Sequence, residues 1–308
     1  MQLISAKGIV FFLFLAVSVC RPALASDQVQ TGSTAAGGWF MPTSLQRVYQ
    51  ALADHNMLLA WQELRIVLQQ SKAPVAPDLW RPVFQQLINQ SDCGRRLTEY
   101  PGAMSDWVHQ PRISLSIQDK VNLSQRVYQL KLSIDGASKP VAVSLTDSRG
   151  NQWLSGATSA PEEGYSELES REWFQSVPEG YYQLNIGEKH YPLILASLQE
   201  TARAPAIELQ QTEKNTAGVF VFSPDLSADR NACQRQRLQW QWFDSDYQLA
   251  TPAETIALDA KGHGVPPRDR PDNVNWLSAV VADSYFQGAI KIENVHRLTV
   301  PVRYILTD

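Results

Sequence analysis

The apolar residues of this chain change their period once, and that change limits the fold more than any other feature. Between residues 39 and 92 they recur at helical spacing, as in Leu45, Val48 and Leu52. From Ile113 onward they alternate with polar residues, which is typical of strands with one buried face. Because helical and strand segments do not alternate along the chain, a doubly wound parallel fold is disfavoured. We therefore predict an α+β multidomain chain, in which a small N-terminal all-α helical unit is followed by two immunoglobulin-like antiparallel β-sandwiches.

Three helices are expected in the first unit. Thr43 and Gln46 match the T-x-x-Q pattern of a capping box, so the first helix is predicted to begin at Thr43. The second is predicted over residues 57–70. Asp78 is predicted to cap the third, which tolerates Pro82 because that proline falls in the first turn.

Alternating segments separated by turn residues mark the β-regions. Strands are expected at 113–117, 127–134, 141–145, around Trp153, 181–186, 191–195, 219–222, 238–243, 276–282, 289–292 and 300–306. The acidic segment 162–172 is expected to be an exposed loop or a short helix. The expected organisation is a signal peptide at 1–25, a flexible linker at 26–38, a helical domain at 39–108, a first β-sandwich at 109–200 and a second at 205–308.

The N-terminus indicates export. Lys7 precedes an apolar run over 9–19, and Ala-Leu-Ala at 23–25 matches a small-x-small cleavage site. A run of about 11 residues is shorter than the roughly 20 that a membrane-spanning helix needs. We expect cleavage between Ala25 and Ser26, giving a periplasmic or secreted protein with no stable membrane insertion.

Cys20 offers an alternative to that cleavage. Residues 17–20, Val-Ser-Val-Cys, loosely match a bacterial lipobox, which would leave Cys20 lipid-anchored. A lipobox has a small residue before its cysteine, whereas Val19 is large and Arg21 is unusual in the next position. Cleavage after Ala25 is therefore favoured.

Charge and composition exclude one class of partner. Without the leader, the chain has 25 basic and 31 acidic residues and a net charge of −6. A mildly acidic chain has no general attraction to nucleic acid, and none is expected as a partner. The hydrophobic content of 44% is enough for a buried core.

Two cysteines, Cys93 and Cys233, remain after cleavage. In an oxidising compartment they are expected to form one disulfide, closing a loop of about 140 residues. The chain-entropy model gives such a bridge about 5 kcal/mol, and measured values are often lower. The alternative is two separate thiols. A metal site is not expected, because no His or second Cys lies at ligand spacing from either cysteine.

No recognisable catalytic motif occurs in the chain. It lacks a G-x-S-x-G elbow, an S-x-x-K pair, an H-E-x-x-H helix and a phosphate-binding glycine loop. We predict no catalytic residue, no cofactor-binding residue and no cofactor. An enzyme with a scattered active site remains the least favoured alternative.

The tryptophans are the most suggestive candidates for ligand contact. Trp240 and Trp242 share one strand face by their spacing, and Trp276 begins a later strand. These three are a possible ligand platform. The alternative is that they are core residues, since a buried tryptophan is a standard feature of such sandwiches.

Three segments carry a family resemblance. They are Trp39 to Leu45 at the entry to the helices, Ser91 to Gly94, and Leu238 to Trp242. With these, the chain resembles an uncharacterised family of exported proteins of Vibrio-type gammaproteobacteria, classed as a domain of unknown function. The resemblance implies a periplasmic location and an accessory role in envelope sensing or maintenance, and it transfers no catalytic residue.

These observations favour a non-enzymatic periplasmic interaction protein with an envelope protein as its partner. The alternative is a carbohydrate or peptidoglycan-binding module that contacts a glycan through surface tryptophans.

Overall fold

The computed structural model describes residues 43–70, 75–97, 111–197, 207–210, 219–222, 233, 236–267 and 269–305. The predicted signal peptide, its cleavage site at Ala25 and Ser26, and the predicted linker lie outside this range. No helix in the described part of the chain is long and apolar enough to cross a membrane.

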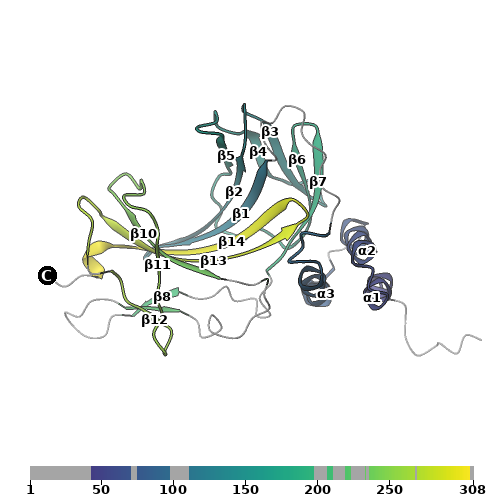
Figure 1. Ribbon diagram of the computed structural model, residues 1–308, viewed down its shortest axis with the longest axis horizontal. Helices are drawn as coiled ribbons and strands as arrows, with labels where there is room; N and C mark the ends of the chain where they lie inside the picture. The colour runs from purple at the N-terminus through teal and green to yellow at the C-terminus, as the bar shows by residue number, and fades with distance from the viewer. Residues whose placement is uncertain are drawn as a thin grey trace, which may run out of the picture. The chain divides into compact units, whose positions relative to one another are not determined.

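Three helices open the described chain: α1 (Gln46–Ala53), α2 (Met57–Gln70) and α3 (Pro77–Gln90) (Figure 1). Their buried stripes meet around large aromatic side chains, with the rings of Trp61 and Trp80 each 6.2 Å from that of Phe84. α2 contacts strands β6 (Gly180–Ile186) and β7 (Lys189–Leu195). The helices therefore contribute to the same core as the β-structure that follows.

The predicted helix starts need correction at two positions. No side-chain hydrogen bond caps α1, and the N–H of Gln46 instead bonds to the backbone carbonyl of Thr43 at 3.0 Å. The prediction of a capping box at Thr43 and Gln46 was therefore wrong. α3 begins at Pro77, and Asp78 lies inside its first turn, where its charge suits the helix dipole.

Fourteen strands follow the helices in the described residues. Besides β6 and β7, they are β1 (Arg112–Val121), β2 (Arg126–Asp135), β3 (Ala142–Asp147), β4 (Gln152–Ala157), β5 (Tyr165–Glu169), β8 (Ile207–Gln210), β9 (Val219–Phe222), β10 (Arg237–Phe243), β11 (Glu254–Thr255), β12 (His263–Gly264), β13 (Trp276–Gln287) and β14 (Ile290–Pro301). The described part of the chain confirms the predicted order of an α-helical unit followed by β-sheets. The acidic segment 162–172 contains strand β5, because its residues pair with β2.

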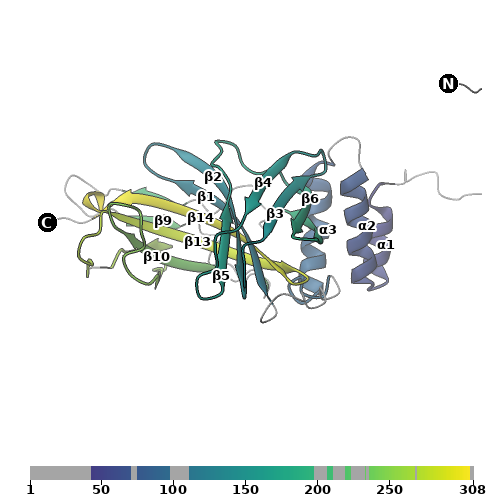
Figure 2. The same cartoon turned by 90° about the horizontal axis from the view of Figure 1, so that it is seen from above.

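The strands form three sheets, in the orders β11-β10-β13-β14-β1-β2-β5, β4-β3-β6-β7 and β12-β9-β8. Figures 1 and 2 show the long hairpin of β13 and β14 lying beside β1. β1 and β14 pair in parallel over nine positions, while all other described strand pairs are antiparallel. Strands from both predicted β-regions thus share one seven-stranded sheet, and the predicted domain boundaries stay predictions.

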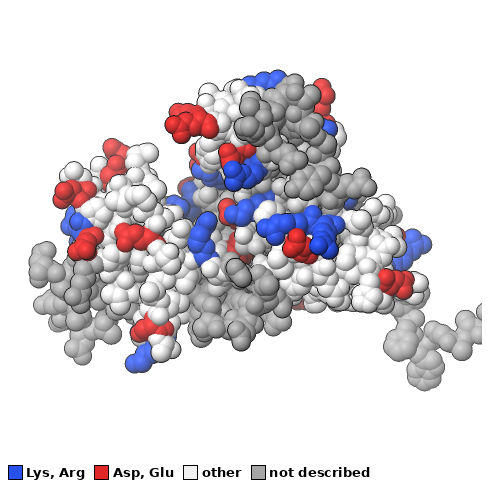
Figure 3. Space-filling view, viewed as in Figure 1, with Lys and Arg blue, Asp and Glu red and all other residues white. Residues whose placement is uncertain are grey.

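One face of the seven-stranded sheet is covered near both ends. At one end, Leu115, Leu132 and Tyr285 belong to a core shared with the helices and the four-stranded sheet. At the other end, Trp240 packs against Phe220 of the three-stranded sheet, with 4.9 Å between ring centroids. The opposite face carries ion pairs such as Lys131 with Glu167 and Lys120 with Glu172. Figure 3 shows Lys and Arg side chains, with Asp and Glu among them, gathered over the middle of the surface.

Candidate functional site

A polar band separates the two apolar areas on the covered face of the long sheet. It consists of Asp119, Arg126, Tyr128, Asp283, Asn294 and His296. Asp119 is the register partner of His296 on one side and of Tyr128 on the other. Asp283 is the register partner of Asn294. The alternation of strand side chains therefore brings polar groups from β13, β14, β1 and β2 to neighbouring levels on one face of the sheet.

Asp119 is the centre of this band. Its carboxylate accepts a hydrogen bond from Nε of Arg126 at 2.7 Å and lies 2.8 Å from Nδ1 of His296. Burial alone would raise the pKa of Asp119, but hydrogen bonds and charge from His296 and Arg126 outweigh it and leave that pKa below its ordinary value. Asp119 is therefore an ionised, firmly held acceptor at neutral pH.

The neighbouring groups of the band are also fixed. The amide of Asn294 donates to Oδ1 of Asp283 at 2.9 Å. The guanidinium of Arg126 lies 5.3 Å from the ring centroid of Tyr128, within reach of a cation–π interaction. Burial, followed by the charge of Asp119, raises the pKa of Tyr128, so its phenol stays neutral.

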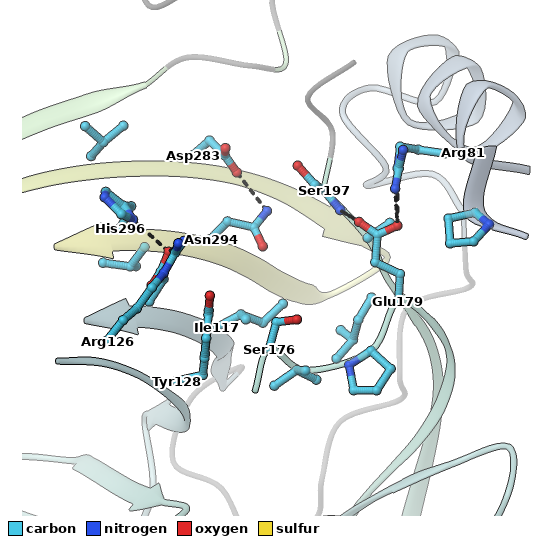
Figure 4. Close-up of a pocket in the computed structure, with 18 residues that line it drawn as sticks. Arg81, Ile117, Arg126, Tyr128, Ser176, Glu179, Ser197, Asp283, Asn294 and His296 are labelled. Atoms are coloured by element: carbon cyan, nitrogen blue, oxygen red, sulfur yellow. Dashed lines mark hydrogen bonds and ion pairs between the residues drawn. The ribbon is translucent and has the colours of Figure 1, made fainter. Parts of the chain in front are cut away.

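A cavity of about 480 Å³ opens over the band and is lined in part by other elements. We call it the polar cleft (Figure 4). Its walls include Arg81 from α3, the segment 176–179 before β6, and the segment 195–197 at the end of β7. Nε and Nη2 of Arg81 both bond to Oε2 of Glu179, the latter at 2.6 Å, and Oε1 of Glu179 accepts from the N–H of Ser197 at 2.9 Å. These bonds link α3, the segment before β6 and the end of β7 at the edge of the cleft.

The cleft combines polar and apolar groups. It presents donors and acceptors held by neighbours, together with apolar side chains from Ile117, Val177 and Val281. Among the described residues, no group of three or more His, Cys, Asp or Glu side chains could hold a metal ion.

Comparison with known proteins places the chain in a family. The model of DUF2861, a protein family of unknown function, matches residues 39–303. The chain belongs to the DUF2861 family. No curated protein matches it.

Solved structures show only distant similarity to this DUF2861 member. The N-terminal Ig1-2 module of the Drosophila receptor protein tyrosine phosphatase DLAR is 13% identical, with 63% of this chain and 100% of that one covered and a TM-score of 0.27. A Salmonella alpha-2-macroglobulin is 12% identical, with 66% and 15% covered and a TM-score of 0.20. Dpr11 IG1 bound to DIP-gamma IG+IG2 is 12% identical, with 62% and 99% covered and a TM-score of 0.19.

The predicted tryptophan platform requires correction. Trp240 and Trp242 are only 2% and 0% exposed, because both point into the core beneath the three-stranded sheet. Neither ring can therefore meet a ligand from solution. Trp276 lies on the opposite face of the sheet, half-buried and stacked on Tyr247 with 5.0 Å between ring centroids. Its role in ligand contact stays a prediction.

The two cysteines are joined in a disulfide. The Cα atoms of Cys93 and Cys233 lie 5.0 Å apart across a sequence separation of 140. The N–H of Phe286 donates to the carbonyl of Cys93 at 2.8 Å, which ties the bridge to the end of β13. A disulfide fits an extracytoplasmic protein, since such bonds persist in oxidising compartments.

Sequence reasoning did not identify the polar band. Its signal is an interruption of apolar alternation, as at Asp119 between Ile117 and Val121 or at Asp283 between Val281 and Tyr285. A single polar residue at such a position is common in strands. These polar residues form a site only because the register of four strands places them near one another.

Proposed function

We propose that this DUF2861 member is a non-enzymatic periplasmic interaction protein whose polar cleft receives a segment of an envelope protein. The observation that supports this most is the composition of the cleft, where paired charged groups stand beside apolar side chains on a rigid sheet. A protein segment offers the complementary mixture of backbone hydrogen-bonding groups and apolar side chains. Because the groups of the cleft are already held in place, binding orders few of them and costs little conformational entropy.

The electrostatics of Asp119 favour binding over acid–base chemistry. A general base works best when its pKa lies near the working pH. The pKa of Asp119 is instead lowered, by its contacts with His296 and Arg126. A carboxylate of this kind is a strong hydrogen-bond acceptor and a weak base, so it suits recognition.

The periplasmic location rests on two supports. The disulfide between Cys93 and Cys233 suits an oxidising compartment. The leader ending at Ala25 matches a signal peptide by its charge, its short apolar run and its small-x-small site. Fractionation of cells that produce the full chain tests the location, and an uncleaved chain in the cytosol would contradict it.

Site-specific photo-crosslinking in cells tests the proposed site. A photoreactive residue in place of Ser176, which lines the cleft and is exposed, is expected to form a discrete adduct with one envelope protein. The same residue in place of Ser155, exposed on β4, is the matched control and is expected to form none. Mass spectrometry of the adduct identifies the segment that is bound.

A blocking variant makes this test specific to the cleft. Pro178→Trp adds a large ring at the exposed cleft edge and keeps the backbone carbonyl that accepts from Tyr182. It is expected to abolish the Ser176 adduct while leaving the circular dichroism spectrum unchanged. The proposal fails if Ser176 gives no adduct, if Ser155 gives the same one, or if the adduct persists beside Pro178→Trp.

A further inference from the structure

A second cavity, of about 730 Å³, lies on the opposite face of the seven-stranded sheet. We call it the aromatic cavity. Its side chains include Lys120, Glu172, Phe243, Tyr247, Trp276 and Arg297. They come from β1, the segment after β5, β13, β14, the end of β10 and the turn that follows it, with the β1–β2 turn at the rim.

One wall of the aromatic cavity is a stacked pair of rings. Tyr247 and Trp276 lie at an interplanar angle of 19°, so each ring covers one face of the other. Tyr247 remains 58% exposed. Its turn is fixed by Oδ1 of Asp244, which accepts from the N–H groups of Asp246 and Gln248 at 2.9 Å each. The tyrosine ring is therefore a positioned, solvent-facing apolar surface.

Arg297 supplies a positive charge on which the carboxylate of Glu169 acts only from beyond ion-pair distance. Its guanidinium lies 5.4 Å from the ring centroid of Phe243, and within the described part of the chain no carboxylate pairs with it. The Nε atom of Arg297 is buried and has no hydrogen-bond partner among the described residues, and the same holds for Nε1 of Trp276. Buried donors are nearly always satisfied in folded proteins, so two unsatisfied donors in one cavity indicate a missing acceptor.

The other charges of the aromatic cavity cancel. Nζ of Lys120 lies 3.4 Å from Oε1 of Glu172. Among the charged side chains that line the cavity, only Arg297 is then left without a direct carboxylate partner, and Glu169 offsets part of its charge from outside the lining. A ligand that balances it carries a single carboxylate or a comparable anion, since guanidinium binds carboxylates through paired hydrogen bonds.

We propose that the aromatic cavity binds a carboxylate-bearing saccharide, such as a uronic acid unit. The carboxylate bonds to Arg297 and Trp276, and the apolar face of the sugar ring packs on Tyr247. The side-chain amides of Asn122 and Gln125, both exposed at the rim, are suited to hydroxyl groups of the sugar. This proposal is independent of the polar cleft, because the two cavities lie on opposite faces of the sheet.

Titration of the full mature chain with trigalacturonate, followed by calorimetry and ligand-observed NMR, tests the proposal. Maltotriose is the neutral control and is expected to bind at least about tenfold more weakly, because it lacks the charge-assisted hydrogen bonds. Acetate and a tri-glutamate peptide are the other arms. Acetate binding as tight as trigalacturonate would reduce the site to a simple anion site, and tighter binding of the peptide would replace the saccharide with an acidic peptide.

Matched variants locate the binding. Arg297→Met keeps an apolar chain of similar length and is expected to weaken trigalacturonate binding about tenfold or more, as is Tyr247→Ala. Arg149→Gln, in an exposed turn, removes the same charge elsewhere and is expected to change nothing. Arg297→Lys tests the geometry if Arg297→Met fails to fold. The proposal would be overturned if trigalacturonate does not bind at millimolar concentration. It would also be overturned if Tyr247→Ala and either Arg297 variant each bind trigalacturonate as tightly as the native chain.

Discussion

Nδ1 of His296 lies 2.8 Å from Oδ2 of Asp119, although the two residues are 177 positions apart in the chain. They are register partners in the parallel pairing of β1 and β14. This contact links the first long strand to the last one, and it lies at the floor of the polar cleft. The residues that define the candidate site therefore also hold the two β-regions in one sheet.

The first prediction concerns the pH dependence of stability. The folded-state pKa of Asp119 is lowered by its contacts with His296 and Arg126, while its unfolded value is about 3.9. Its contribution is therefore present above the unfolded pKa and is lost as the pH falls through the folded pKa. Asp119→Asn is expected to cost about 2 kcal/mol at pH 7, since the variant leaves the guanidinium of Arg126 without its carboxylate. Urea unfolding from neutral to acidic pH measures the difference, which should shrink below about pH 4.

Asp135→Asn is the control for that measurement. Asp135 pairs with Arg112 at 3.1 Å on the same strand pair, but both side chains are at least half exposed. Its replacement is expected to cost less than about 1 kcal/mol. Equal losses for the two variants at neutral pH would contradict the role given to the buried contact.

The second prediction concerns Gly94, where the chain passes close to the end of β13. Its φ is +86°, and an added Cβ would stand 1.7 Å from the carbonyl oxygen of Phe286. That contact is with backbone, so Gly94→Ala forces the chain to move, and we expect a loss of about 3 kcal/mol or more. Chemical unfolding measures it.

Gly150→Ala separates steric contact from backbone strain. Gly150 has nearly the same φ, +84°, but nothing lies within 4 Å of its added Cβ. It is expected to cost only about 1 kcal/mol, from the left-handed backbone conformation alone. Similar losses at both glycines would mean that the approach of Phe286 is not a constraint.

Local pattern was enough to predict the helices and most strands. Apolar spacing placed α2 at 57–70, period-two alternation placed β2, and the turns on either side placed β6. The segment that became β5 was not recognised because its acidic residues are paired rather than solvated: Lys131 bonds to Glu167 and lies 3.6 Å from Glu169. The ion pairs with Lys131 of the neighbouring strand β2 explain why such a charged segment forms a strand.

Non-local register could not be predicted in the same way. Nothing near Ile113 in the sequence indicates that β1 pairs with β14, because the pairing is decided by the packing of strands that are far apart in the chain. The polar cleft depends on this register, so its residues were not among the predicted ones. The disulfide was predictable because only Cys93 and Cys233 lie outside the predicted signal peptide.

The third prediction distinguishes core from surface among the aromatic residues. Trp240 is 2% exposed and packs against Phe220 and Phe222, so Trp240→Ala is expected to cost about 3–5 kcal/mol. Tyr247→Ala is the comparison, because Tyr247 is 58% exposed, and it is expected to cost less than about 1 kcal/mol. Thermal unfolding of both variants measures the contrast. A small loss for Trp240→Ala would restore that ring as a candidate for ligand contact.

The fourth prediction concerns the bridge between Cys93 and Cys233. It joins the segment after α3 to the chain before β10, across a separation of 140 residues. Closing so long a loop stabilises the fold by up to about 5 kcal/mol in the chain-entropy model, chiefly by restricting the unfolded chain. Reduction of the mature protein is therefore expected to lower its Tm by about 5–15 °C, as followed by circular dichroism with and without dithiothreitol. The double variant Cys93→Ser, Cys233→Ser should show the lowered Tm from the start and no further change with reductant. If the untreated native protein instead reacts with a thiol reagent at both cysteines, and reductant leaves its Tm unchanged, the two sulfurs are separate thiols and the stabilisation assigned to the bridge is wrong.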